Sequence, residues 1–321
     1  MGSTRALARA AMALVVLLAL SSSAAATYPE RLIRFVVSAP AGTAPDIVAR
    51  LIAPKMSEQL GQTIVIDNKA GANGNIAAAE VAKAASDGYT VLVTVAGTLT
   101  ANPYLYPKVA VTNLEPITQI ATVDFVVATR PSLNVRTLAE LLDLIRRQPG
   151  KINGATTANG SFPHLAAELM KQDAGLDFTI VKHNGGTAAG ASVAGEHTDF
   201  VIETLAVLGS LVEAKRLVPI ASTGPARSPL SPDLPTVSES GIGGYSFTGW
   251  VALAAPKGTP PDVTSVLQRA AAKALEDTVI RERLISMQFL PVVSTPQQFG
   301  RIIAEEKAKL GTIIEHAKLA E

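Results

Sequence analysis

The sequence predicts an α/β protein built from two lobes. Apolar runs of strand length alternate with longer segments whose apolar residues recur at helical spacing, in one series that ends near Gly97 and a second that starts near Phe125. Hydrophobic residues make up 48% of the 321 residues and aromatic residues only 4%, so small aliphatic side chains supply the core. This composition suits close layers of strands and helices and argues against disorder.

The first series of elements predicts the first lobe. We expect strands at residues 33–39, 63–68 and 89–97, with helices at 45–61 and 74–86. Gly61 is a typical C-terminal stop for the first of these helices. The third strand is an unbroken apolar run, which is typical of a strand buried on both faces.

The second series predicts a second α/β unit and a return to the first. We expect strands and helices to alternate from residue 125 to residue 223, followed by a surface connection rich in Pro, Ser and Gly at 224–246. A strand at 247–256 and helices at 261–277 and 295–318 complete the chain. The expected divisions are a signal peptide at 1–26, a first lobe at 27–123, a second lobe at 124–224, and a linker with return to the first lobe at 225–321.

The N-terminal segment has the features of an export signal. Two arginines precede an apolar run at about residues 10–20, and Ala24 and Ala26 fit an A-x-A cleavage site. The apolar run is too short for a comfortable bilayer span, so we expect a removed signal peptide, with an uncleaved tail as the alternative. In a Gram-negative cell the mature protein would then reside in the periplasm.

Charge, cysteine and histidine content exclude several classes of function. Residues 1–26 carry two arginines and no acidic residue, so their removal leaves 26 basic against 27 acidic residues. This balance makes neither nucleic acid nor an anionic membrane an expected partner. The chain has no cysteine, and its four histidines lack the HExxH and HxH spacings, so we expect no metal and no cofactor.

The stretch SAPAGTAPDIVAR, at residues 38–50, is a candidate anion site. It joins a strand to a helix at the sheet edge where α/β proteins bind ligands, and the free amides of a helix start favour an anion. Gly42 permits close approach, and Thr43 adds a hydroxyl. The alternative is an ordinary turn in which Asp46 caps the helix. Neither GK[ST] nor GxGxxG is present, so nucleotides are not expected.

Further loops repeat this pattern, and together they predict a cleft lined by amides and hydroxyls from both lobes. Each follows a strand and precedes a helix, and each taken singly is more simply explained as a capped helix. They contribute Thr98, Thr156, Asn159, Gly160, Ser161, His164, Gly186 and Thr187.

Support for catalysis is poor. Ser161 lies in NGSFP rather than in the GxSxG motif of a nucleophile elbow, so an exported hydrolase using Ser161 and His164 remains only a remote alternative. Glu203 ends a strand and could meet a ligand cation in the cleft, although a solvated or hydrogen-bonded carboxylate is the plainer interpretation. Trp250 fills core or hinge space, or else forms an aromatic wall of the cleft.

The chain resembles the solute-binding receptors of tripartite tricarboxylate transporters, the Bug proteins. The resemblance rests on the order and spacing of segments such as YPERLIRFVVSAPAGTAPDIVAR, INGATTANGSFPHLAAELM and LPTVSESGIGGYSFTGWVALAAPKGTP, and it covers nearly the whole mature chain. It implies a type II periplasmic-binding-protein fold, in which two α/β lobes joined by crossing strands close over a small carboxylate.

The resemblance also implies which residues hold the ligand. The first strand–helix loop of such receptors holds a ligand carboxylate through waters and amides, which here implies Ala41, Gly42, Thr43, Ala44 and Asp46. The second lobe contributes the turn 159–161 with His164, and the loop 185–187. The chain departs from the family in having Ser38 and Ala39 where a Pro-Phe pair is usual, and Gly42 and Thr43 where Gly-Gly is usual. The missing aromatic ring at Ala39 should widen or reshape the pocket beside the carboxylate.

The sequence therefore predicts an exported, monomeric, non-catalytic receptor for a small organic carboxylate. The ligand could be a di- or tricarboxylate, an amino acid or an aromatic acid, and the expected partners are the membrane permease subunits of the transporter. A ligand-sensing receptor that reports to a membrane two-component sensor is the alternative, because both functions need only differential binding by open and closed forms.

Overall fold

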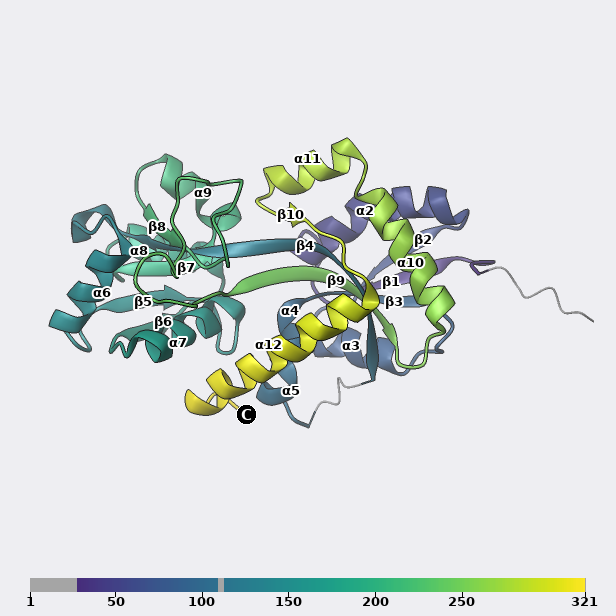
Figure 1. The fold of residues 1–321 in the computed structure, drawn as a ribbon, viewed down its shortest axis with the longest axis horizontal. Helices are drawn as coiled ribbons and strands as arrows, with labels where there is room; N and C mark the ends of the chain where they lie inside the picture. The colour runs from purple at the N-terminus through teal and green to yellow at the C-terminus, as the bar shows by residue number, and fades with distance from the viewer. Residues whose placement is uncertain (1–27, 109–112, 321) are drawn as a thin grey trace, which may run out of the picture.

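The computed structural model describes residues 28–108 and 113–320, and it consists of two α/β lobes side by side (Figure 1). The predicted fold class is confirmed. The predicted signal peptide at 1–26 lies outside the described residues. No helix in the described part of the chain is long and apolar enough to cross a membrane.

A sheet runs through both lobes in the order β2-β1-β3-β9-β4-β7-β5-β6, with β10 and β8 also paired to β4. Strands β1, β2 and β3 are parallel to one another, as are β5, β6 and β7. The strands are β1 (Ile33–Val37), β2 (Ile64–Asn68), β3 (Thr90–Val95), β4 (Leu114–Thr129), β5 (Asn153–Thr156), β6 (Thr179–Lys182), β7 (Phe200–Thr204), β8 (Val218–Ser222), β9 (Thr248–Pro256) and β10 (Leu290–Pro291).

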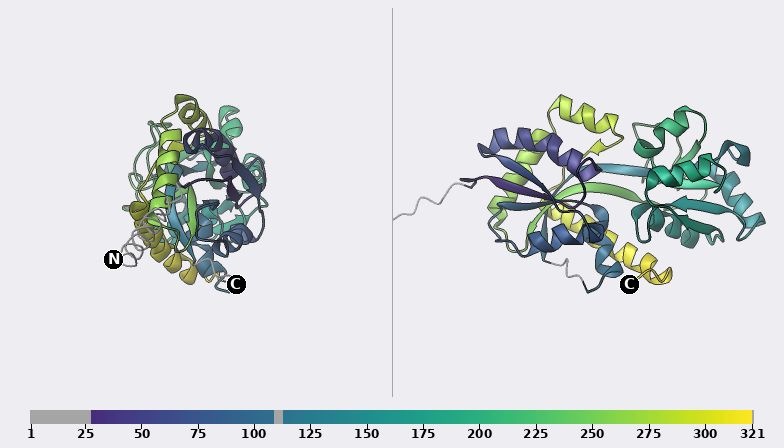
Figure 2. Two further views of the ribbon diagram at one scale, coloured as in Figure 1. Left: turned by 90° about the vertical axis from the view of Figure 1, so that its right-hand side faces the viewer. Right: turned by 180° about the vertical axis from the view of Figure 1, so that it is seen from behind.

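Two long antiparallel strands, β4 and β9, connect the lobes (Figures 1 and 2). β4 pairs with β9 from Leu114 to Asp124 and with β7 from Phe125 to Thr129. The sequence predicted this strand only from Phe125 onward. The first half of β4 was not predicted, because two register shifts against β9 interrupt the alternation of apolar and polar residues. The lobe divisions at 123/124 and 224/225 stay predictions.

Helices cover both faces of the sheet. They are α2 (Ala44–Leu60), α3 (Asn75–Ala82), α4 (Ala96–Thr100), α5 (Asn102–Leu105), α6 (Leu138–Arg147), α7 (Phe162–Ala174), α8 (Gly186–Ala194), α9 (Leu205–Glu213), α10 (Pro261–Ala274), α11 (Thr278–Ser286) and α12 (Pro296–His316), with 3₁₀ turns η1 (Ala72–Gly74) and η2 (Pro131–Leu133). The predicted C-terminal stop of α2 is confirmed, since Gly61 adopts a left-handed conformation with φ 64°. The sequence did not predict α4, α5 or α11.

The last helix contacts both lobes. Near its start, Phe299 packs edge-on against Trp250 of β9, in a core that also holds residues of α3 and β3. Near its end, Leu310, Ile313 and Ile314 join the core of the second lobe. Helix α12 therefore crosses the junction alongside the two long strands (Figure 1).

Candidate functional site

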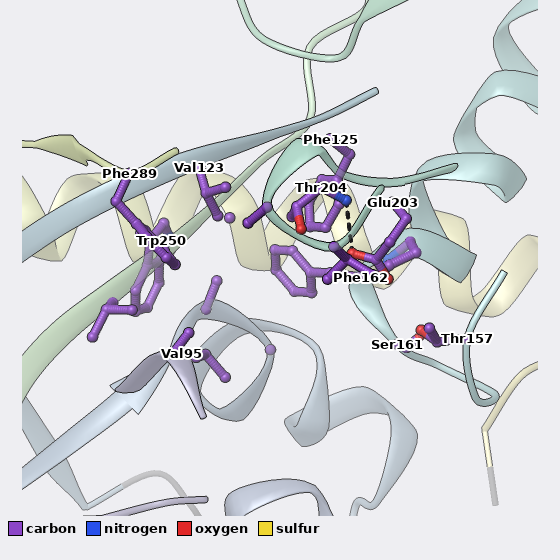
Figure 3. Close-up of a pocket in the computed structure, with 18 of the residues that line it drawn as sticks. Val95, Val123, Phe125, Thr157, Ser161, Phe162, Glu203, Thr204, Trp250 and Phe289 are labelled. Carbon is purple, nitrogen blue, oxygen red and sulfur yellow. Dashed lines mark hydrogen bonds between the residues drawn. The ribbon is translucent and has the colours of Figure 1, made fainter. Parts of the chain in front are cut away.

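A cavity of about 660 Å³ lies between the lobes. Figure 3 shows Trp250, Phe289 and Val95 on one side, and Glu203, Ser161 and Thr157 on the other. Residues of both crossing strands, including Val123 and Gly249, also line it. This volume is in the range of roughly 300–1,000 Å³ that is typical of small-molecule sites.

Four helix N-termini meet at this cavity. The lining includes residues at the starts of α2, α4, α7 and α9, namely Ala44, Ala96–Thr98, Ser161–Pro163, and Thr204 with Ala206. The first amides of a helix have no carbonyl partner within the helix, and the helix dipole makes this end positive. Helix starts of this kind favour an anion without requiring a lysine or arginine. At α7 and α9 some of the amides are already used, because the His164 amide donates to Ser161 and the Thr204 amide donates to Glu203.

Of the predicted residues in the first loop, the structure places Ala44 at the cavity. Ala39, Ala41, Gly42, Thr43 and Asp46 are not among the lining residues. The Thr43 hydroxyl donates a hydrogen bond to the carbonyl of Pro40 at 2.6 Å, and so it closes the turn. The ligand-contact roles predicted for these residues stay predictions.

Asp46 is buried behind the loop and holds it in place. Its carboxylate accepts hydrogen bonds from the amide of Gly42 at 2.8 Å, from Asn68 at 2.9 Å and from Arg50 at 3.0 Å. Burial on its own would raise the pKa of Asp46, but the hydrogen bonds from Arg50, Gly42 and Asn68 outweigh it and hold the pKa below its ordinary value. Asp46 thus fixes the loop that presents Ala44 to the cavity.

In the second lobe, Gly160 and Ser161 line the cavity, whereas Thr156, Asn159 and His164 do not. The Ser161 hydroxyl accepts hydrogen bonds from the hydroxyl of Thr157 at 2.7 Å and from the amide of His164 at 3.3 Å. The imidazole of His164 accepts from the amide of Gly160 at 2.9 Å through Nδ1. His164 therefore shapes the turn. A serine–histidine hydrolase requires a hydrogen bond between the histidine ring and the serine hydroxyl, and the ring of His164 makes no such bond with Ser161.

Thr98 and Glu203 also line the cavity, but Gly186 and Thr187 do not. Gly186 still has a defined role, because a Cβ at this position would lie 2.4 Å from Oε2 of Glu203. The missing side chain makes room for the Glu203 carboxylate, which also accepts a hydrogen bond from the amide of Thr204 at 2.7 Å (Figure 3). Burial raises the pKa of Glu203, and the hydrogen bond from Thr204 opposes this rise.

Aromatic rings form much of the cavity wall. Phe125, Phe162, Trp250 and Phe289 all line it, and the sequence singled out only Trp250 among them. Phe162 stands within the NGSFP motif, so the motif itself could have indicated it. Phe289 follows α11 in a segment that has no glycine, turn or motif signal, and only the folded chain brings it to the cavity.

Trp250 is held from behind by α12. Its indole N–H donates a hydrogen bond to Glu306 at 2.8 Å. Burial raises the pKa of Glu306 to about 7, and the hydrogen bond from Trp250 and the charge of Lys309 only partly oppose this. The carboxyl group behind the cavity wall therefore titrates near neutral pH.

Replacing Glu306 by glutamine should flatten part of the pH dependence of stability. The Glu306 carboxyl group loses its proton near its ordinary pKa of 4.5 in the unfolded chain and near 7 in the folded protein. Between these values the unfolded state binds fewer protons, so stability falls as pH rises, by at most about 1.4 kcal/mol per pH unit. Glutamine still accepts the Trp250 hydrogen bond but does not titrate. Urea unfolding across this range measures the difference, with the exposed neighbour Glu305→Gln as control. Parallel profiles for Glu306→Gln and wild type would contradict the assignment.

Comparison with known proteins gives consistent matches over most of the chain. The family model described as "Tripartite tricarboxylate transporter family receptor" (TctC) matches residues 48–319. Protein BugT of Bordetella pertussis is 31% identical over 284 residues, which is 87% of each chain. The solved structure of R. palustris Rpa4515 with adipate is 32% identical, with a TM-score of 0.77, and covers 91% of this chain and 99% of that one. MatC (Rpa3494) from Rhodopseudomonas palustris with bound malate is 27% identical, with a TM-score of 0.72, over 89% and 100%.

Proposed function

The chain belongs to the TctC family of tripartite tricarboxylate transporter receptors, which are periplasmic solute-binding proteins rather than enzymes, and we propose that it captures a small organic carboxylate in the cavity between its lobes and delivers it to a tripartite tricarboxylate-type permease. In this proposal the protein is exported by its N-terminal segment and works as a monomer in the periplasm.

The observation that carries the proposal is the convergence of four helix N-termini on one cavity. Ala44 and Ala96 come from the first lobe, and Phe162 and Ala206 from the second. A ligand whose carboxylate lies at the helix starts of the first lobe and whose body lies against the second lobe would contact both lobes at once, so binding would favour the form in which the lobes are close together. Two structural neighbours were solved with adipate and with malate, and both ligands are carboxylates, which supports the same ligand class.

Replacing Ala44 by aspartate tests the anion site directly. The new carboxylate would lie at the first turn of α2, where it suits the helix dipole and should not destabilise the fold. It would also face the ligand carboxylate, so we expect affinity to fall by roughly a hundredfold or more. Isothermal titration calorimetry against mono-, di- and tricarboxylates measures the effect.

The matched control is Ala44→Asn, which has nearly the same size but no charge. It should retain most of the affinity, because the amides at the helix start remain and no like charge is added. Unchanged binding by Ala44→Asp, or equal loss in both variants, would contradict an anion site at this helix. Absence of binding to any carboxylate by the wild type would contradict the proposed function itself.

The ligand-sensing alternative uses the same cavity and differs in the partner. Deleting the receptor gene should abolish uptake of a labelled carboxylate if the protein feeds a permease. Loss of a transcriptional response with uptake intact would favour the sensor instead.

A further inference from the structure

The lining of the cavity narrows the ligand class. Among the lining residues in the described part of the chain there is no lysine or arginine, and Glu203 is the only side chain that titrates. The rest is mainly apolar, with the rings of Phe125, Phe162, Trp250 and Phe289 supplying the largest surfaces. Buried apolar area of this kind favours an apolar ligand body.

The helix starts can compensate one negative charge, but the structure offers little for a second. A carboxylate at Ala44 would lie at the positive start of the long helix α2, whereas a second carboxylate reaching the second lobe would meet the charge of Glu203. The second ligand carboxylate and the Glu203 carboxylate would then be close neighbours in a poorly solvated site. They cannot both stay ionised there without a large loss of ligand affinity.

The Glu203 carboxylate is buried and hydrogen-bonded at the second-lobe side of the cavity. Its residue is 7% exposed, Oε1 accepts the amide hydrogen of Thr204 at 2.7 Å, and Oε2 occupies the space left by the missing side chain of Gly186. Moving the Glu203 carboxylate away from an anion would break its hydrogen bond with the Thr204 amide. It can accept a hydrogen bond from a ligand hydroxyl or amine.

We propose that this receptor selects a monocarboxylate with an apolar, ring-sized body, and that Glu203 sets this choice by rejecting a ligand with a second carboxylate. The inference rests on the proposed function, since it assumes that the cavity binds carboxylates. It assigns to Glu203 the role of a specificity-determining residue.

The experiment compares ligands that differ only in the second carboxylate. Hexanoate with adipate, and benzoate with terephthalate, are such pairs. In titration calorimetry at mildly alkaline pH, the wild type should bind the better monocarboxylate at least about tenfold more tightly than its dicarboxylate partner. Glu203→Gln keeps the size of the side chain and its acceptor for Thr204 but removes the charge. It should reduce this preference at least about tenfold, mainly by improving binding of the dicarboxylate.

The control is Glu213→Gln, which makes the same change at an exposed position at the other end of α9. It should leave the preference unchanged, and thermal unfolding of both variants verifies that they fold. A wild type that binds a dicarboxylate as tightly as its partner, or a preference that survives Glu203→Gln, would overturn the inference and leave the proposed function standing. If neither member of either pair nor any other carboxylate bound, the proposed function would fail as well.

Discussion

Replacing Trp250 by alanine should lower the free energy of unfolding by roughly 3–5 kcal/mol, the range typical of large-to-small substitution of a buried aromatic residue. Trp250 is 2% exposed, packs edge-on against Phe299 with ring centroids 4.9 Å apart, and donates its indole hydrogen to Glu306. The substitution removes both contacts and also a wall of the cavity. Ligand affinity should therefore fall together with stability, and urea denaturation and calorimetry measure the two effects.

Two further variants separate these effects. Trp250→Phe keeps most of the packing but leaves Glu306 without its donor, so we expect a smaller loss of roughly 1–3 kcal/mol. Phe178→Ala removes a buried ring that packs edge-on against Phe200 in the core of the second lobe, away from the cavity. It should destabilise the protein about as much as Trp250→Ala while leaving ligand affinity unchanged. Equal loss of affinity in both alanine variants would indicate a global effect and not a wall of the cavity.

Replacing Asp46 by alanine should lower the free energy of unfolding by roughly 1.5–3 kcal/mol, because it removes a buried carboxylate that accepts three hydrogen bonds. The amide of Gly42 and the side chain of Asn68 lose their acceptor. Since the pKa of Asp46 lies below its ordinary value, its stabilisation is present above that ordinary value and is lost as pH falls through the folded one. The free energy of unfolding of the variant should therefore fall less steeply than that of the wild type as the pH is lowered.

The matched control is Asp143→Ala. Asp143 pairs with Arg146 at 3.3 Å on the surface of α6, with side chains 65% and 50% exposed. Such exposed pairs contribute about 0–1 kcal/mol, so this variant should be close to neutral. Urea unfolding at neutral and acidic pH compares the two proteins, and similar small losses would contradict a positioning role for Asp46.

The sequence predicted the lobes and most elements because local patterns specify them. Strand β3 is a buried and mostly apolar run, and Gly61 ends α2 in the conformation that glycine favours. Strand β4 was predicted only in part, because irregular pairing with β9 erases its period, and short α4 offers too few residues for a helical pattern. Propensity and period can be read locally, whereas bulges depend on the partner strand.

The same distinction separates the parts of the candidate site. Loops that join a strand to a helix are visible in sequence, and they led to Ala44, Thr98 and Ser161, which the structure brings to one cavity. Sequence does not tell which polar groups in a loop are consumed by the loop itself. Asp46 and His164, which the sequence predicts as ligand contacts, are hydrogen-bonded to the amides of their own turns, and their contact with a ligand stays a prediction.

The two crossing strands have a mechanical consequence. The lobes are parts of one hydrogen-bonded sheet in which β4 passes from β9 to β7 at Asp124 and Phe125, so their relative motion has to bend and twist a paired ribbon. Such a ribbon resists deformation and tends to return to its resting shape, unlike a flexible tether. If closure over a ligand deforms this ribbon, its elastic cost reduces the binding free energy, so a stiffer junction would weaken binding without any change in the residues that touch the ligand.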